Sequence, residues 1–251
     1  MPVSDDMADV IVLCYHAVSP RWDADLSVTP EFLDRQVGYL LARGWRATTF
    51  TDAVRGRMPG PSLAITFDDA FASVARFALP ILARHGVPAT VFAPTDFMDG
   101  GAQLAWSGTD HWRASPFADE LAAMDWDGLR ALADAGWEIG SHTCTHPRLT
   151  SLDDAALARE LTESRERCAQ ELARPCRSIA YPYGDVDARV AAAAAAAGYE
   201  AGAKLAADLR DEGPLRYPRI GIYHPDAWAR FRLKVAGPVR RLRRSALARA
   251  R

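Results

Sequence analysis

Two pairs of side chains in this sequence have the types and the spacing that metal-assisted chemistry requires. Asp68 and Asp69 are adjacent and end one apolar run, and His142 and His146 lie one helical turn apart directly after another. Two carboxylates and two imidazoles can supply three ligands to a divalent cation and leave one base over, as a metal-assisted hydrolase requires. Non-haem iron oxygenases use the same ligand set. We disfavour them because the carboxylates here precede both histidines by more than seventy positions.

The elements that must position these groups alternate between strand-like and helix-like patterns. Short apolar runs bounded by turn residues indicate strands that are buried on both faces, as in a parallel sheet. Seven such runs are Asp9–Tyr15, Leu63–Phe67, Ala89–Ala93, Trp137–Ser141, Ser178–Tyr181, Tyr199–Lys204 and Pro218–Ile222. Helical patterns cover Pro30–Gly44, Phe71–His85, Asp127–Ala135, Leu152–Ala173 and Val186–Ala197, with Thr29 and Ser151 as expected N-caps of the first and fourth.

This alternation predicts an α/β fold, a single-domain (β/α)7 barrel. Seven strands in 251 residues favour a closed or nearly closed barrel over an open sheet. In a parallel barrel, residues that directly follow a strand lie at the carboxyl-terminal rim, where active sites are built. The two carboxylates and the two histidines are therefore expected to meet there.

Composition restricts the partners. The chain is 49% hydrophobic and 25% charged with a net charge of −2, so no general attraction to nucleic acid is expected. Met1–Asp6 is acidic and lacks the apolar core of a secretory signal, which predicts a cytoplasmic protein. Ala229–Arg251 carries nine basic residues, no acidic ones and several apolar ones, a pattern that could lie on the inner face of an anionic membrane. We divide the chain into a barrel over residues 1–225 and a basic C-terminal helix or tail over residues 226–251, within or appended to the same domain.

One connection, Pro94–Trp126, is unusually long and rich in aromatic residues. Long loops at the carboxyl ends of strands commonly carry function. Trp106 and Trp112 are therefore candidates to stack on sugar rings. The alternative is that the aromatic residues form a small satellite core beneath the loop.

At these motifs the chain resembles the polysaccharide deacetylase family, carbohydrate esterase family four. The resemblance covers most of the chain, from about residue 10 to residue 222. The family motif Thr-Phe-Asp-Asp is matched by residues 66–69, and the motif His-Ser/Thr-x-x-His is matched by residues 142–146. The segment that leads into the second motif, residues 135–141, is also similar to that of the family.

The resemblance implies a distorted (β/α) barrel and assigns roles to the rim residues. Asp68 corresponds to the general base of the family. Asp69, His142 and His146 correspond to its metal ligands.

The third family motif, Arg-x-Pro-Tyr-Gly, is only partly kept. Pro182, Tyr183 and Gly184 match it, but Ala180 stands where the arginine usually is. By resemblance, the backbone N–H of Tyr183 helps to form an oxyanion hole, and Pro182 and Tyr183 contribute to the substrate site. Arg219, which lies in a later strand-like run, is our candidate to supply the missing charge from across the barrel.

The general acid has two candidates. The last motif of the family provides a histidine, and His224 in Ile222-Tyr223-His224 fits it loosely. We favour His16, which ends the first strand-like run, because a Tyr-His pair recurs there in branches of the family that lack the usual last motif.

Together these assignments predict a metal-dependent hydrolase that removes N-acetyl groups from an amino sugar in a saccharide or glycan precursor. Zinc is the expected metal, with cobalt, nickel or iron as alternatives. The expected partner is an N-acetylated saccharide or a lipid-linked or nucleotide-linked sugar. Two other functions remain open: a non-catalytic carbohydrate-binding relative of the family, and an O-acetyl esterase on the same scaffold.

Overall fold

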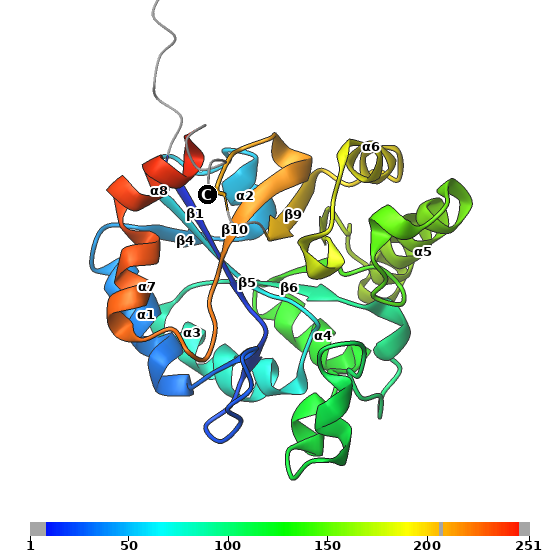
Figure 1. The fold of residues 1–251 in the computed structure, drawn as a ribbon, viewed down its shortest axis with the longest axis horizontal. Helices are drawn as coiled ribbons and strands as arrows, with labels where there is room; N and C mark the ends of the chain where they lie inside the picture. Colours follow the sequence, from blue (N-terminus) through cyan, green and yellow to red (C-terminus); the bar gives the residue numbers. More distant parts are fainter. Residues whose placement is uncertain (1–8, 206–207, 246–251) are drawn as a thin grey trace, which may run out of the picture.

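The computed structural model describes residues 9–205 and 208–245, in which parallel strands form a barrel surrounded by helices (Figure 1). The strands are β1 (Val10–Tyr15), β2 (Ala17–Val18), β3 (Ser27–Val28), β4 (Arg46–Thr48), β5 (Ser62–Phe67), β6 (Thr90–Ala93), β7 (Glu138–Ser141), β8 (Ser178–Ala180), β9 (Ala201–Leu205) and β10 (Tyr217–Gly221). The α-helices are α1 (Pro30–Leu41), α2 (Phe50–Val54), α3 (Leu79–His85), α4 (Trp126–Asp134), α5 (Asp154–Leu172), α6 (Ala188–Ala196), α7 (Trp228–Val235) and α8 (Gly237–Arg244). Shorter helical turns are the π-helix η1 (Val74–Ala78) and the 3₁₀ turns η2 (Thr95–Phe97), η3 (Asp110–Ala114), η4 (Ala118–Leu121), η5 (Leu149–Ser151), η6 (Pro182–Gly184) and η7 (Pro214–Arg216).

Seven of the strands close the barrel. Their order is β1-β10-β9-β8-β7-β6-β5, and β5 pairs again with β1 in continuous register from Val10↔Ser62 to Tyr15↔Phe67. Every pairing in this ring is parallel. The predicted single-domain (β/α)7 barrel is confirmed. Sequence analysis missed the short strands β2, β3 and β4, of which β4 pairs with the amino-terminal half of β5.

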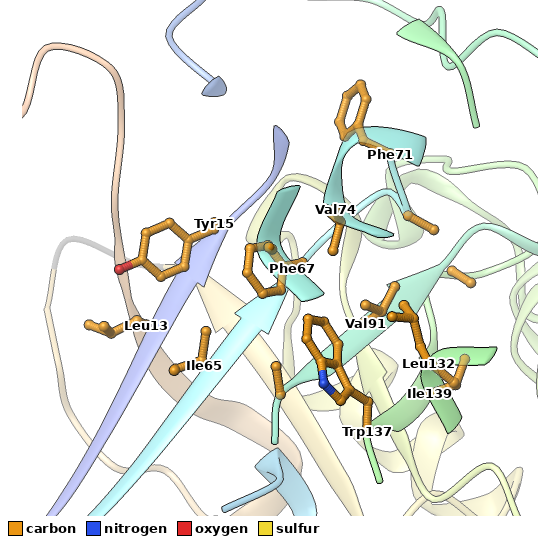
Figure 2. Packing of buried hydrophobic residues seen from close by; sticks show 14 of the residues in the cluster. Leu13, Tyr15, Ile65, Phe67, Phe71, Val74, Val91, Leu132, Trp137 and Ile139 are labelled. Carbon is orange, nitrogen blue, oxygen red and sulfur yellow. The ribbon is translucent and has the colours of Figure 1, made fainter. Parts of the chain in front are cut away.

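Side chains alternate between the inside of the barrel and the layer beneath the helices, as successive residues of a strand must. Figure 2 shows part of the outer layer, where Tyr15 and Trp137 stack on opposite sides of Phe67 with ring centroids 5.5 and 5.7 Å away. The barrel interior combines alanines with three aromatic rings. The interior cluster consists of Val12, Phe50, Ala53, Ala64, Phe92, Ala180, Ala201, Ala203 and Tyr217.

Two expectations about the helices were inexact. Thr29 caps α1 as predicted, because its hydroxyl accepts a hydrogen bond from the N–H of Phe32 at 3.2 Å. The fourth predicted helix begins two residues late, since Asp153, not Ser151, caps α5 by accepting from the N–H of Ala156. The helix expected over Phe71–His85 is helical from residue 72, but Val74–Ala78 form the π-helix η1 before α3 begins.

The basic C-terminal segment packs on the barrel through α7 and α8. Trp228 of α7 lies against Tyr39 of α1, with ring centroids 5.1 Å apart. Arg240 of α8 is buried and makes a bidentate ion pair with Asp9 at the start of β1. Several of the basic residues predicted to face a membrane are thus held by the barrel itself.

The same segment also carries exposed apolar side chains. Leu233 and Leu242 are 59% and 60% exposed, so contact with a membrane surface stays a prediction. Leu247, which was part of that pattern, lies outside the described residues. No helix within the described ranges is long and apolar enough to cross a membrane.

Candidate active site

The carboxylate of Asp68 lies at the carboxyl end of β5 and points into the barrel. Its backbone N–H donates to the carbonyl of Tyr15, which continues the β1–β5 pairing one residue past the strand. Arg219 reaches it from β10 and donates two hydrogen bonds, Nη1 to Oδ1 and Nη2 to Oδ2, each 2.6 Å. Nη1 of Arg219 also donates to the hydroxyl of Thr66 at 3.1 Å. Arg219 therefore lies beside the predicted base, on β10, which only β9 separates from β8, the strand that leads into the third motif.

This ion pair sets the charge of the base. Asp68 is 3% exposed and Arg219 is 1% exposed. Burial would raise the pKa of Asp68, but the charge and the hydrogen bonds of Arg219 outweigh it and hold that pKa well below its usual range. The Asp68 carboxylate therefore stays ionised at neutral pH.

Three further side chains converge beside this pair, although they come from different strand ends. Nε2 of His142 lies 3.3 Å and Nε2 of His146 lies 3.5 Å from Oδ1 of Asp69. The three ligand atoms lie within 4.8 Å of one another, and all three residues are buried. Asp69, His142 and His146 thus form one group with the composition and spacing of a cation site.

The orientation of the first histidine is fixed from behind. Nδ1 of His142 lies 2.8 Å from the carbonyl oxygen of Ala180 on β8. A carbonyl can only accept, so Nδ1 carries a proton, and Nε2 is the nitrogen of this ring that remains to bind a cation. Metal-binding histidines usually have such a second hydrogen bond, which selects the tautomer.

The donor atoms of this group fit a bound cation. Oδ1 of Asp69 is buried without a hydrogen-bond partner. Leaving a buried carboxylate oxygen unpaired destabilises the fold, and a bound cation would satisfy it. Burial, followed by the nearby charge of His142, lowers the pKa of His146 to about 3, so this imidazole is neutral at pH 7. Neutral imidazoles and a carboxylate are suitable ligands for zinc and its neighbours.

Backbone strain is concentrated at these residues. Among the described residues, six non-glycine positions have positive φ, and five belong to the site: Asp69 (70°), Ala70 (53°), Thr143 (69°), His146 (62°) and Tyr183 (60°). Such conformations cost of order 1–3 kcal/mol each and occur mainly where function requires them. The surrounding structure must therefore hold all three motif turns in place.

A pocket of about 540 Å³ opens over the group. Its lining includes both carboxylates, both metal-site histidines and His16, together with Trp106, Tyr183 and Tyr223. This volume lies within the usual range of small-molecule sites. Aromatic rings beside a polar floor are suited to bind a sugar ring over the reacting groups.

The retained part of the third motif forms one wall of this pocket. Pro182–Gly184 form the turn η6, and the Tyr183 ring lies 4.7 Å from the ring of His146. Gly184 has φ +70° and lies so close to the backbone of Leu205 that any β-carbon there would collide with it. The turn therefore needs glycine at this position, which explains why this part of the motif is kept.

The two general-acid candidates differ in position. His16 lines the pocket, and its Nδ1 is buried without a hydrogen-bond partner. Its ring nitrogen also groups with Cys14 and Asp68 within 4.8 Å. His224 is exposed and is not among the residues that line this pocket. The geometry supports the preference for His16.

The two tryptophans proposed as sugar-binding residues, Trp106 and Trp112, lie in different surroundings. Trp106 lines the pocket and stacks on the ring of His146, with centroids 3.9 Å apart. Trp112 does not line it and packs edge-on against Trp22 and Phe117, at 5.6 and 5.7 Å. The satellite-core alternative therefore describes Trp112, and its assignment to the substrate site is corrected.

Several residues of the site were missed from the sequence. Asp25, Tyr223, Asp226 and Arg230 line the pocket but lie in connections or in α7, where no motif marks them. Glu160, in the middle of α5, accepts hydrogen bonds from the turn that carries the histidines. Glutamate is common in helices, so only its place on the buried face could have signalled a role.

The structure combines a parallel seven-stranded barrel with a pair of carboxylates and a pair of histidines at its carboxyl-terminal rim. This combination is typical of a hydrolase built on a barrel. The sequence model of the polysaccharide deacetylase family matches residues 55–202, more than half of the chain. The chain belongs to this family of hydrolases. The resemblance inferred from the motifs is confirmed.

Individual relatives agree with this placement. YxkH of Bacillus subtilis (strain 168), whose name describes polysaccharide deacetylation, is 24% identical over 222 residues, covering 86% of this chain and 72% of the relative. The poly-beta-1,6-N-acetyl-D-glucosamine N-deacetylase of Staphylococcus aureus (strain MSSA476) is 23% identical over 184 residues, 68% of this chain. The match spans 58% of that protein's length.

Solved structures share the fold. The deacetylase PplD of Streptococcus pyogenes, in complex with acetate, superposes with a TM-score of 0.75 over 91% of this chain and 99% of that one, at 21% identity. IcaB from Ammonifex degensii superposes with a TM-score of 0.68 over 89% and 95% of the two chains, at 23% identity.

Proposed function

We propose that this protein is a metal-dependent hydrolase that removes N-acetyl groups from an amino sugar in a saccharide or glycan precursor. The observation that carries the proposal is the convergence of Asp69, His142 and His146 beside a separate, arginine-paired carboxylate. A binding protein has no use for that spare base. Zinc suits two neutral imidazoles and one carboxylate, and cobalt, nickel or iron would suit the same ligands.

Asp69, His142 and His146 would hold the cation. The chemistry that such a cation supplies when bound is polarisation of the acetyl carbonyl and a lower pKa for water. Asp68 is the base that accepts a proton from the attacking water. Its ion pair with Arg219 keeps it ionised and fixes the direction of both carboxylate oxygens.

The remaining groups act on the acetyl group and on the leaving amine. The backbone N–H of Tyr183 would stabilise the negative oxygen that develops as the hydroxyl adds to the acyl carbon, and one such donor is worth about 10²–10³ in rate. His16 would deliver a proton to the amide nitrogen as the carbon–nitrogen bond breaks. The products are acetate and a free amine, so the protons balance.

The substrate class follows from the relatives and the pocket. Some relatives are named as N-deacetylases of poly-beta-1,6-N-acetyl-D-glucosamine. The first substrate to test is therefore an N-acetylglucosamine saccharide. The pocket volume and the aromatic side chains of Trp106 and Tyr183 are compatible with a sugar ring above the metal site.

The test is an acetate-release assay on N-acetylglucosamine oligosaccharides, with and without a chelator and with zinc added back. We expect release that the chelator abolishes and zinc restores. Asp68→Asn should abolish release yet keep zinc bound, because it removes the base and spares the ligands. Release that persists in chelator with no metal bound would refute the proposal.

An O-acetyl esterase on the same scaffold uses the same groups. Matched O-acetyl and N-acetyl sugars separate the two activities, because only amide cleavage requires protonation of a poor leaving group. We expect His16→Ala to reduce N-deacetylation far more than O-deacetylation.

A further inference from the structure

A buried carboxylate on helix α5 makes several hydrogen bonds to the turn between the two histidines. Glu160 is only 6% exposed, and it lies in the middle of α5. Its Oε2 accepts hydrogen bonds from the backbone N–H groups of Cys144 at 2.8 Å and Thr145 at 3.1 Å. Its Oε1 accepts from the hydroxyl of Thr145 at 2.7 Å. All three donors lie between the two proposed ligand histidines.

The turn needs this support because both of its ends are strained. Thr143 and His146 have φ of 69° and 62°, so the two residues between them cannot continue a strand or a helix. The N–H groups of Cys144 and Thr145 would otherwise lack acceptors within the turn, and an N–H that is shielded from water destabilises the fold when it is left unpaired. Glu160 provides an acceptor to both.

A second contact from the same face of α5 reinforces the first. Ser164 lies one turn after Glu160, and its hydroxyl is 2.8 Å from the hydroxyl of Ser141. The Ser141 hydroxyl in turn accepts from the N–H of Thr143 at 3.0 Å. Helix α5 therefore holds the turn at two places, one before each strained residue.

We propose that Glu160 is a positioning residue that sets the separation and direction of His142 and His146, and so determines how tightly the cation is held. This rests on the proposed metal function. Glu160 touches neither the cation site nor the pocket, and its effect passes through the backbone of the turn. Hydrogen-bonded groups behind metal ligands typically contribute 10–100-fold to metal affinity.

The experiment measures zinc affinity directly, by competition of purified protein with a chromophoric chelator. We expect Glu160→Ala to weaken zinc binding by about 10–100-fold. Glu160→Gln keeps one acceptor oxygen and should fall between the alanine variant and the wild type. Glu166→Gln is the matched control, because Glu166 is exposed on the same helix, and it should bind zinc as the wild type does.

A milder variant guards against loss of folding. Thr145→Val removes only the hydroxyl bond to Glu160 from an exposed residue, and it should weaken zinc binding by a few-fold without altering the circular dichroism spectrum. Wild-type affinity in folded Glu160→Ala, or in Thr145→Val if the alanine variant does not fold, would overturn the inference. Failure of the wild type itself to bind zinc would instead refute the proposed metal function.

Discussion

Removal of the Arg219 side chain is the sharpest test of the catalytic base. In Arg219→Met, Asp68 stays buried but loses two hydrogen bonds of 2.6 Å. It also loses the positive charge of the guanidinium that donates them. Removal of one member of a buried ion pair costs about 3–5 kcal/mol, because the remaining charge is left uncompensated. At 1.36 kcal/mol per pKa unit, this cost corresponds to a rise of about two to four units in the pKa of Asp68.

The expected result is a displaced pH–rate profile. In the wild type, Asp68 is ionised throughout the accessible range, because Arg219 holds its pKa well below the usual value. In Arg219→Met, the higher pKa of Asp68 should bring its protonation toward the accessible range, so kcat/KM should fall at the acidic end of the profile where the wild-type value does not. The assay is acetate release from pH 4 to 9, with zinc occupancy checked at each pH.

Stability should change with pH in a defined direction. The folded-state pKa of Asp68 lies below its unfolded value of about 3.9, so the pair stabilises the wild type above that pH, and this contribution is lost as pH falls through the folded pKa. In the variant, burial without the charge of Arg219 raises the folded-state pKa, so the carboxylate becomes protonated at a higher pH than in the wild type. The stability deficit of metal-free Arg219→Met should therefore be largest near pH 7 and shrink toward pH 4.

Two controls make the result interpretable. Lys204→Met removes another buried cation, which lies in β9 and pairs with Glu212 in the connection between β9 and β10, and it should lower stability without moving the acidic limb. The double variant Asp68→Asn/Arg219→Met should recover part of the stability that the single variant loses, because no buried charge is left alone. An unchanged acidic limb in zinc-loaded Arg219→Met would refute the assignment of Asp68 as the base.

Three further predictions concern the acid, the loop and the third motif. His16→Ala should reduce kcat for N-deacetylation by about 10²–10⁴-fold with zinc retained, whereas His224→Ala should leave it unchanged; the opposite result would exchange their roles. Trp106→Ala should raise KM and weaken zinc binding, whereas Trp112→Ala should lower the melting temperature and leave KM unchanged, since it packs outside the pocket. Gly184→Ala should lower both the melting temperature and kcat, because residue 184 has positive φ and an added β-carbon would collide with the backbone of β9. Thermal denaturation and initial rates measure the two effects, and normal activity would argue against an oxyanion role for this turn.

The barrel could be predicted from the sequence because its strands are continuous apolar runs of ordinary length. Strands β5 and β7 lie within one residue of their predicted bounds, since each run ends abruptly in polar groups. Strand β4 could not be found, because its three residues, Arg46–Thr48, carry no apolar pattern and form a strand only by pairing with β5.

The groups of the site were predictable where a motif fixes neighbouring residues, and less so where tertiary contacts select them. Asp68 and His142 follow strands, so their position at the rim follows from topology alone. Arg219 could be proposed only because the third motif lacks its arginine. Only its position on the apolar face of α5 separates Glu160 from the other glutamates of that helix, and the sequence does not show that this face meets the turn.

The origin of the arginine that pairs with Asp68 has a consequence for how the enzyme matures. Arg219 belongs to β10, the last strand to be made and the one that joins β9 to β1. A nascent chain that has not yet inserted β10 already contains every residue of the cation group but has a base without its counter-charge. The counter-charge of the base therefore arrives with the strand that closes the ring, so the charge balance of the site depends on completion of the barrel.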